Sequence, residues 1–332
     1  MDLIQSNGQP HYGRFSILPT RIDFEKYHYT NPAGELLTGW RKRLKYKKFK
    51  FCSIQHEDYT ICMAIADLAW AGHGLVYVYQ HSTGQVLAWQ GSNFLARHTR
   101  LDEQPLFNHS AFQKSPFRLV IEHANGVRYL CVTKHGEVKL SARIFCAGTD
   151  PLSVCSPTDT GWSYTQKLTS LGCEGFFLNK QGQTVHFNAK SFASLEDTCG
   201  FIPAEAAWCW LSCNFWDQHN NRIGLNLSSA LHTGNHENCL WVNGVLYPLP
   251  ELQFSLRHEQ QWQVRSLDGS VMLSFELKWA RIERMNFRFT ASHCSQWQVS
   301  VTGIVQQGEH CIELNQEYGL FEQHLPKKAD SV

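Results

Sequence analysis

Long apolar runs are missing from this chain. Its 332 residues contain no uninterrupted apolar stretch of the roughly 18 residues or more that a membrane-spanning helix needs. The N-terminal segment, Met1-Asp-Leu-Ile-Gln-Ser-Asn-Gly8, has neither the basic start nor the apolar region of a secretory signal peptide. We therefore expect a cytoplasmic protein.

Charge is also scarce. Charged residues make up 18% of the chain and the net charge is +1, so no overall field would attract nucleic acid or acidic polymers. The hydrophobic share of 43% still allows a sizeable core and argues against disorder. We expect no nucleic-acid partner.

The sequence signatures of several common enzyme classes are absent. No Gly-x-Ser-x-Gly nucleophile elbow, Walker loop or Gly-x-Gly-x-x-Gly segment after a strand occurs. Common hydrolase, nucleotide-binding and dinucleotide-binding functions therefore lose support, and we expect no cofactor.

The twelve cysteines include no Cys-x-x-Cys pair and stand singly among apolar neighbours. Zinc ribbons need closely spaced thiolates, and disulfide frameworks belong to small secreted chains, so we expect buried, reduced thiols. His232 and His236 have the spacing of two ligands on one helical face, but Gly234 and Asn235 disfavour a helix there. No metal site is expected.

Short strand-like runs joined by tight turns fill the sequence. Asn125-Gly126 and Asn243-Gly244 are strong signals for two-residue hairpins, and Asp268-Gly269 joins two further runs. Helical candidates are confined to short segments near residues 92–102 and 316–325. This pattern predicts an all-β protein built from antiparallel sandwiches or barrels, with few short helices.

One segment near the middle of the chain breaks the strand pattern. Residues 147–161 are rich in Pro, Gly, Ser, Thr and Asp and show no alternation. A chain of 332 residues is long for one domain. We therefore predict an N-terminal β-barrel-like domain over residues 1–155 and a C-terminal one over residues 156–332, which carries a Trp-rich strand.

That strand lies in the segment from Ala207 to Leu227. Its alternation places three tryptophans and one asparagine on a single face. Indole N–H and amide groups need polar partners that aliphatic packing cannot supply, so this face suits the wall of a ligand cavity better than a dry core. The candidate ligand-binding residues, here and in the segment that follows, are Trp208, Trp210, Asn214, Trp216, Asn226, Glu237, Asn238 and Trp241.

Three acidic residues, in two segments of the chain, are candidates for catalysis. Asp67 follows an apolar run and must be paired or neutral if it is buried; alternatively, it ends a strand and accepts backbone N–H groups in the turn before Gly72. Glu196 and Asp197 are expected in a loop before the Trp-rich strand. There, mutual repulsion would keep one of them protonated, or the pair would cap a turn.

A basic run extends over residues 41–50. Interpreted as a strand, it places Arg41, Arg43, Lys45 and Lys47 on one face. One interpretation is a solvent-exposed strand at the edge of a sheet, whose lysines prevent another strand from pairing with it. The functional alternative is a rim that meets anionic lipid or a phosphorylated isoprenoid, as a peripheral contact with a membrane surface.

Several segments resemble an uncharacterised bacterial family, the domain of unknown function 2804. They occur in order along nearly the whole chain, at residues 45–52, 64–72, 195–203, 208–227, 237–244 and 318–322. More distantly, two all-β halves with a Trp-x-Trp strand are similar to the tandem lipocalin-type proteins, which include carotenoid hydratases, kievitone hydratase, tocopherol cyclase and fungal Diels–Alder cyclases. The resemblance implies two lipocalin-like barrels or half-barrels, with an apolar ligand at one mouth or between them.

Hydratases and cyclases of isoprenoid chains protonate a double bond and steer a carbocation, which requires a protonated carboxylic acid and aromatic faces. We therefore predict binding or conversion of an isoprenoid or fatty-acyl molecule in an aromatic-lined pocket, with Asp67, Glu196 or Asp197 as the acid. Two alternatives stay open. One is a glycan-binding or glycan-processing protein, and the other is a non-catalytic lipid carrier or scaffold.

Overall fold

The chain folds into two compact units. The structure, a computed structural model, describes residues 1–31, 33–203, 207–229, 237–287 and 290–326. The units comprise Met1–Ile202 and Pro203–Val332, and we call them the N-terminal and the C-terminal unit. The division differs from the expected boundary at residue 155, which falls inside strand β11 (Leu152–Thr158).

The composition of the expected linker did not prevent it from forming a strand. β11 forms an antiparallel hairpin with β12 (Gly161–Leu178). Ser153 Oγ and the Tyr164 hydroxyl lie 2.9 Å apart in a hydrogen bond between the two strands. A buried strand can therefore contain hydroxyl side chains where a hydroxyl of the neighbouring strand lies within hydrogen-bonding distance, and this allows the Ser- and Thr-rich segment to belong to a sheet.

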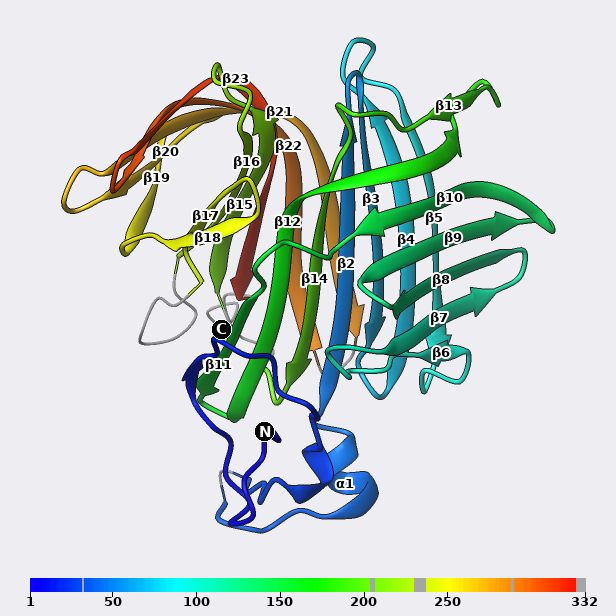
Figure 1. The fold of residues 1–332 in the computed structure, drawn as a ribbon. Coiled ribbons are helices and arrows are strands. Elements are labelled where there is room, and N and C mark those ends of the chain that lie inside the picture. The colour runs from blue at the N-terminus through cyan, green and yellow to red at the C-terminus, as the bar shows by residue number, and fades with distance from the viewer. Residues whose placement is uncertain (32, 204–206, 230–236, 288–289, 327–332) are drawn as a thin grey trace, which may run out of the picture. The chain divides into compact units, whose positions relative to one another are not determined.

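The N-terminal unit contains one 14-stranded antiparallel sheet in the order β5-β4-β3-β2-β14-β12-β10-β9-β8-β7-β6, with β1, β11 and β13 attached. Strands β7 to β10 cross β2 to β5 at a steep angle (Figure 1), so the sheet folds over on itself. Besides β11 and β12, its elements are β1 (Gly13–Arg14), the 3-10 helix η1 (Phe24–Lys26), α1 (Gly39–Arg43), β2 (Lys47–His56), β3 (Tyr59–Asp67), β4 (Ala71–Gln80), β5 (Val86–Phe94), β6 (Thr99–Arg100), β7 (Asn108–Lys114), β8 (Phe117–Ala124), β9 (Val127–Lys134), β10 (Glu137–Phe145), β13 (Thr184–His186) and β14 (Phe192–Gly200).

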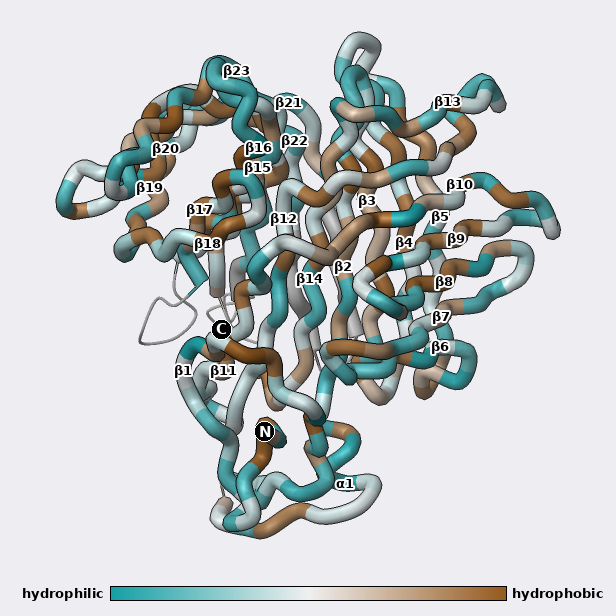
Figure 2. Tube along the Cα trace, in the orientation of Figure 1, coloured by the Kyte–Doolittle hydropathy of each residue, from teal (hydrophilic) through white to brown (hydrophobic). Residues whose placement is uncertain are grey.

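The apolar core of the N-terminal unit lies between the crossing parts of this sheet. Ile61 and Met63 of β3 and Leu119 and Ile121 of β8 belong to one buried cluster. Along β8 buried and more exposed residues alternate, and Figure 2 shows that apolar residues are frequent in the strands of this sheet. This period of two is the pattern from which the strands were predicted.

The C-terminal unit contains a nine-stranded antiparallel sheet in the order β18-β17-β16-β15-β23-β22-β21-β20-β19. Its strands are β15 (Trp208–Trp216), β16 (Arg222–Ser228), β17 (Cys239–Val242), β18 (Val245–Pro248), β19 (Leu252–His258), β20 (Gln261–Ser266), β21 (Val271–Phe287), β22 (Thr290–Gln307) and β23 (His310–Pro326). Leu225, Val264 and Phe321 lie in its apolar core. The two sheets form a nearly closed barrel and a half-barrel, so the all-β prediction is confirmed.

The hairpin predictions are also confirmed. Asn125-Gly126 joins β8 to β9, Asn243-Gly244 joins β17 to β18, and Asp268-Gly269 lies between β20 and β21. Asn125 and Asn243 have φ values of 52° and 52°, and the glycines that follow them are also left-handed. Two successive left-handed residues are typical of the type I′ turn, which matches the twist of the strands it joins.

Both predicted helices are wrong. β5 and β6 cover part of residues 92–102, and Leu95 and Ala96 between them have positive φ, which a right-handed helix does not allow. β23 covers residues 316–325, where Gln316 has a φ of 61° next to a register shift in the sheet. This irregularity interrupts the period of two and imitates helical spacing. Among the described residues no helix is long and apolar enough to cross a membrane.

Candidate functional site

Three neighbouring strands of the N-terminal unit include the three expected catalytic carboxylates, of which Asp67 and Asp197 are close together. Asp67 ends β3, Lys48 and Lys50 lie on β2, and Asp197 lies on β14. In the alignment of the paired strands, Lys48 lies directly opposite Asp67, and Lys50 lies directly opposite Asp197. Residues directly opposite each other share a face, so the structure brings Asp67 and Asp197 into one row, with two lysines between them.

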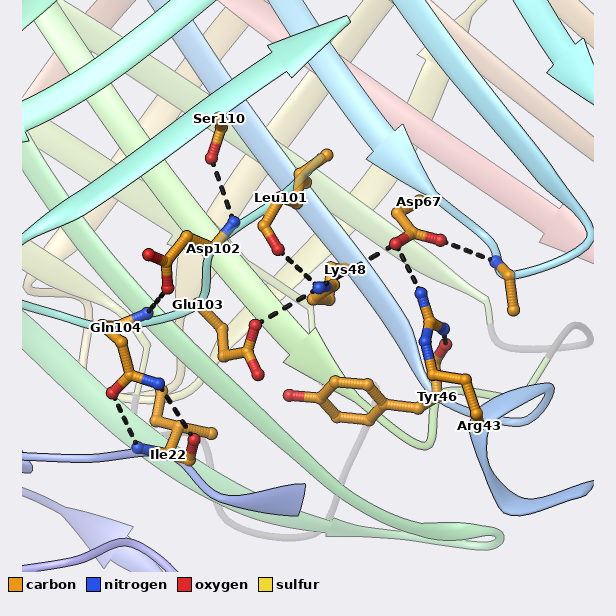
Figure 3. Close-up of polar contacts among 11 residues, drawn as sticks. Ile22, Arg43, Tyr46, Lys48, Asp67, Leu101, Asp102, Glu103, Gln104 and Ser110 are labelled. Carbon is orange, nitrogen blue, oxygen red and sulfur yellow. Dashed lines mark hydrogen bonds and ion pairs between the residues drawn. The ribbon is translucent and has the colours of Figure 1, made fainter. Parts of the chain in front are cut away.

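Cations and a backbone N–H group surround the Asp67 carboxylate (Figure 3). Arg43 Nη2 lies 2.5 Å and Lys48 Nζ 3.9 Å from its Oδ2, and Ala69 N donates to its Oδ1 at 2.9 Å. Lys48 also donates to Leu101 O. These partners satisfy a carboxylate. Asp67 therefore has the strand-end arrangement of its structural alternative, and Arg43, Lys48 and a backbone N–H group already engage its carboxylate.

Asp197 is the centre of a buried ion-pair network. Arg128 Nη1 and Nη2 donate to its two oxygens at 3.1 and 2.9 Å, and Lys50 Nζ lies 2.8 Å from Oδ2. Burial raises the pKa of Asp197, but the two cations outweigh burial and hold the pKa well below its usual range. Asp197 is therefore ionised near neutral pH, which contradicts its expected role as an acid.

Glu196 does not form an acidic pair with Asp197. Both lie within β14 rather than in a loop, and successive residues of a strand point to opposite faces. Glu196 accepts a hydrogen bond from Thr198 Oγ1 at 3.0 Å and lies 3.4 Å from Lys167 Nζ. The expectation of two mutually repelling carboxylates at one site is wrong, because the strand separates them.

Some of the basic side chains of residues 41–50 point toward the protein interior. It is not a single strand, since α1 ends at Arg43 and β2 begins at Lys47. Lys42 is buried and donates to Glu25 O at 2.7 Å, and Lys48 and Lys50 face the interior. The contact of this run with a membrane surface stays a prediction.

The Trp-rich segment forms β15 in the C-terminal unit. Three alternate residues of this strand pack into the apolar core, so Trp208, Trp210, Asn214 and Trp216 point to the opposite side of the sheet, as the alternation predicts. We call this side the tryptophan face. Trp210 and Asn214 are buried, Trp208 is half-buried, and Trp216 is 44% exposed.

Trp208 is joined to two titratable residues of β23. Its Nε1 donates to Glu322 Oε1 at 3.0 Å, and its ring stacks on His324 with 4.0 Å between ring centroids. Gln296 Nε2 donates to the second oxygen of Glu322 at 3.2 Å. The pairing of β15 with β23 places Trp208 opposite His324 and Trp210 opposite Glu322. An aromatic ring, a carboxylate and an imidazole thus share one face.

A second set of contacts connects the other predicted binding residues. Trp210 Nε1 donates to Asn226 Oδ1 at 2.7 Å, and Asn226 Nδ2 donates to Glu237 O at 2.8 Å. Glu237 thus takes part through its backbone in this contact. Asn238 and Trp241 are fully buried. Asn238 Oδ1 accepts a backbone N–H of β16 at 2.7 Å, so its amide holds neighbouring strands together.

Glu322, His324 and Gln296 were missed by the sequence analysis. The motif at residues 318–322 carried part of the family resemblance, yet the surrounding segment was interpreted as a helix. A strand interpretation with the bulge at Gln316 would have placed Glu322 on one face with His324, two residues further along. The tail motif was therefore the signal that could have found them.

One further carboxyl group lies on the core side of the C-terminal sheet. Glu317 pairs with Val301, whose side chain belongs to the apolar core. Burial raises the pKa of Glu317. This residue was not among the sequence candidates because the spacing in β23 changes at the bulge.

No group of three or more His, Cys, Asp or Glu side chains in the described part of the chain could hold a metal ion. His232 and His236 lie outside the described residues. The expectation that they do not form a metal site stays a prediction.

Comparison with solved structures supports the fold. The crystal structure of CghA with Sch210972 matches with a TM-score of 0.55 at 10% identity, covering 86% of this chain and 90% of that chain. Kievitone hydratase from Nectria haematococca matches with a TM-score of 0.51 at 10% identity, covering 86% of this chain and 90% of that chain. These matches confirm the fold that the resemblance implied. No curated protein matches the sequence.

A comparison with protein-family models identifies the family. The model described as "Domain of unknown function (DUF2804)" matches residues 20–327, which include every segment that carried the resemblance. The chain therefore belongs to the DUF2804 family.

Proposed function

We propose that this protein binds a hydrophobic small molecule, of isoprenoid or fatty-acyl type, against the tryptophan face of the C-terminal sheet. The main support for the proposal is the environment of Trp208. Its half-buried ring donates a hydrogen bond to Glu322 and stacks on His324. Indole rings supply a large apolar contact area, and the polar groups beside them can orient a ligand. A molecule with an apolar body and one polar group matches this surface.

We further propose that the ligand is hydrated or cyclised, with Glu322 and His324 as the groups that accept and donate a proton. Such reactions develop positive charge on carbon, which an indole face and a nearby carboxylate stabilise. Glu322 accepts hydrogen bonds at both oxygens, an arrangement that suits a proton acceptor. Asp67 and Asp197 are not part of this proposal because cations already engage both carboxylates.

The likeness to known folds supports this reaction class by analogy. One structural neighbour is named a hydratase, and another was crystallised with a small molecule. A carrier would use the same face without turnover, and a glycan-binding protein would bind sugars there instead.

Native mass spectrometry of the freshly purified protein tests the ligand class directly. We expect a retained molecule rich in carbon and hydrogen, and titration with farnesol or palmitic acid should change the tryptophan fluorescence. A response to maltohexaose, with none to either lipid, would contradict the proposal and favour the glycan alternative.

Incubation of the retained molecule with the protein in D₂O then tests turnover, because protonation at carbon incorporates deuterium. Binding without deuterium uptake or water addition would contradict the proposed reaction and favour a non-catalytic lipid carrier.

Two variants locate the site. Trp208→Phe keeps an aromatic ring but removes the indole N–H, so lipid affinity should fall, whereas Trp262→Phe, which alters a ring stacked on Phe275 in the core cluster, should bind as the wild type does. Glu322→Gln retains an oxygen for Trp208 Nε1 and removes the base. Turnover should then fall by roughly a hundredfold with ligand affinity nearly unchanged.

A further inference from the structure

Large apolar side chains are exposed in two segments of the N-terminal unit. Trp40 of α1 is 73% exposed, and Phe94, the last residue of β5, is 74% exposed. Leu44, directly after α1, and Leu95, directly after β5, are exposed as well. Single exposed apolar residues are common on protein surfaces, whereas several large ones at one place mark an interaction site. The position of the two segments in the fold therefore matters.

Two contacts hold both segments at the same end of the sheet. Arg43, the last residue of α1, pairs with Asp67 at the end of β3, with 2.5 Å between Arg43 Nη2 and Asp67 Oδ2. In the turn after β3, Trp70 O accepts a hydrogen bond from Leu95 N at 2.8 Å. The turn after β3 thus joins α1 to the end of β5, and Figure 1 shows α1 beyond this end of the strands. The exposed apolar residues of the two segments therefore share one end of the unit.

This end of the unit is also basic. We call it the Trp40 surface and define it as residues 38–45 and 94–100. The two segments contain six Lys and Arg residues and no Asp or Glu, although the whole chain carries a net charge of only +1. Three of the six are engaged within the protein, namely Arg41 with Glu35, Lys42 with Glu25 O, and Arg43 with Asp67. The other three are exposed and form no ion pair within the described part of the chain, namely Lys45, Arg97 and Arg100. Their positive charge is available to an anionic partner.

A membrane that contains anionic phospholipid matches both properties of this surface. Tryptophan and other aromatic side chains are enriched at the boundary between lipid headgroups and acyl chains, where an apolar ring and a polar N–H group are both accommodated. Lys and Arg side chains beside them are attracted to the negative surface of such a membrane. The exposed rings and the basic side chains would thus bind the same partner.

We propose that the Trp40 surface binds a membrane that contains anionic phospholipid. Its exposed apolar side chains enter the headgroup region, and its exposed basic side chains contact lipid phosphate groups. The membrane contact predicted from residues 41–50 therefore depends equally on the turn after β5, which lies outside that run. The proposal concerns the N-terminal unit and does not depend on the ligand of the tryptophan face.

Co-sedimentation of the full-length protein with vesicles tests the partner. Binding to vesicles of phosphatidylcholine and phosphatidylglycerol should be at least about tenfold stronger than binding to vesicles of phosphatidylcholine alone. Added salt should weaken the stronger binding, because it screens the basic side chains. Absence of binding to both kinds of vesicle would overturn the proposal. Equal binding to both kinds would overturn it as well, since the basic side chains would then have no role.

Two variants with matched controls test the assigned side chains. Trp40→Ser removes an exposed ring and should lower the affinity for anionic vesicles by about tenfold, whereas Leu267→Ser, at an 85% exposed residue of the C-terminal unit, should bind as the wild type does. Arg97→Gln should lower the affinity by about fivefold. Lys190→Gln removes an exposed charge that pairs with Glu57 near the opposite end of β3, and its binding should be unchanged. Wild-type affinity in both Trp40→Ser and Arg97→Gln would overturn the proposal.

Analytical ultracentrifugation separates a membrane from a second copy of this chain as the partner. The wild type and Trp40→Ser should have the same oligomeric state in the absence of vesicles. An oligomer that dissociates in Trp40→Ser, together with no binding to vesicles, would assign the surface to self-association and overturn the proposal. Because the Trp40 ring is exposed, Trp40→Ser should unfold in urea as the wild type does, and it should still bind palmitic acid if the wild type does. Loss of vesicle binding alone thus separates this surface from the proposed ligand site.

Discussion

The two sheets differ in where they carry polar side chains relative to their own apolar cores. In the N-terminal unit, Lys50, Arg128 and Asp197 lie on the same side as the apolar core and form a buried ionic network. In the C-terminal unit, amide and indole groups lie on the side opposite the core and form neutral bonds such as Trp210–Asn226. The comparison teaches that the N-terminal unit adds a buried ionic network to its apolar core, whereas the C-terminal unit keeps its core apolar and places its hydrogen-bonded indole and amide groups on the other side of the sheet.

The largest effect is expected from Asp197→Asn. The substitution leaves two buried cations without a counter-charge, so the free energy of unfolding should fall by about 3–5 kcal/mol. Urea denaturation followed by fluorescence measures this loss. Glu196→Gln, at the neighbouring position on the opposite face, is the matched control and should cost much less. Equal losses in the two variants would show that the network around Asp197 is no more important than the Glu196–Lys167 pair on the other face of β14.

A smaller loss is expected when a neutral bond of the tryptophan face is broken. Asn226→Ala leaves the buried Trp210 Nε1 without its acceptor, which should lower the free energy of unfolding by about 1–3 kcal/mol. The loss should be the same at pH 7 and pH 5, because neither partner titrates in that range. A loss of unfolding free energy that varies with pH would show that the Trp210–Asn226 bond depends on a charged group, as the network around Asp197 does.

Asp67→Asn should have a smaller effect than Asp197→Asn. The side chain of Arg43 is 32% exposed and keeps water contact when its partner becomes neutral, so we expect a loss of only about 1 kcal/mol. Lipid binding and any turnover of the folded protein should be unchanged. A large drop in turnover at normal stability would restore Asp67 as a catalytic residue.

Acid should affect the two units in opposite directions. Burial lowers the pKa of His81 and of His123 to about 4, so the unfolded chain binds more protons than the N-terminal unit between about pH 6.5 and 4. That unit should lose stability as the pH falls through this range. Burial raises the pKa of Glu317, so the C-terminal unit should gain stability as the pH falls toward the unfolded carboxyl pKa near 4.3.

Hydrogen exchange measured by mass spectrometry at pH 7 and pH 5, with rates corrected for intrinsic exchange, resolves the two units separately. Faster opening of β8 and unchanged or slower opening of β23 at pH 5 is the expected outcome. In His123→Gln the acid-induced opening of β8 should be reduced. The same response in both units would show that these buried groups do not control their stability.

The strand content could be predicted because it is a local property. Alternation and Asn-Gly turns specify where strands such as β8 and β17 end, since a period of two and left-handed turn residues need no distant partner. The helix predictions failed where positive φ values at Leu95 and Gln316 interrupt the pattern. Such irregularities are set by how the strands pair across a sheet and not by local spacing.

The sequence by itself determined the all-β class, the strand that carries Trp208, Trp210 and Trp216, and the family. Only the tertiary structure decided which residues meet. It pairs Asp197 with Arg128, 69 positions earlier, and brings Glu322, 114 positions from Trp208, to the indole N–H. Whether a carboxyl group is an acid or an ion-pair partner depends on the charges around it, and strands distant in the sequence supply those charges once the sheets have formed.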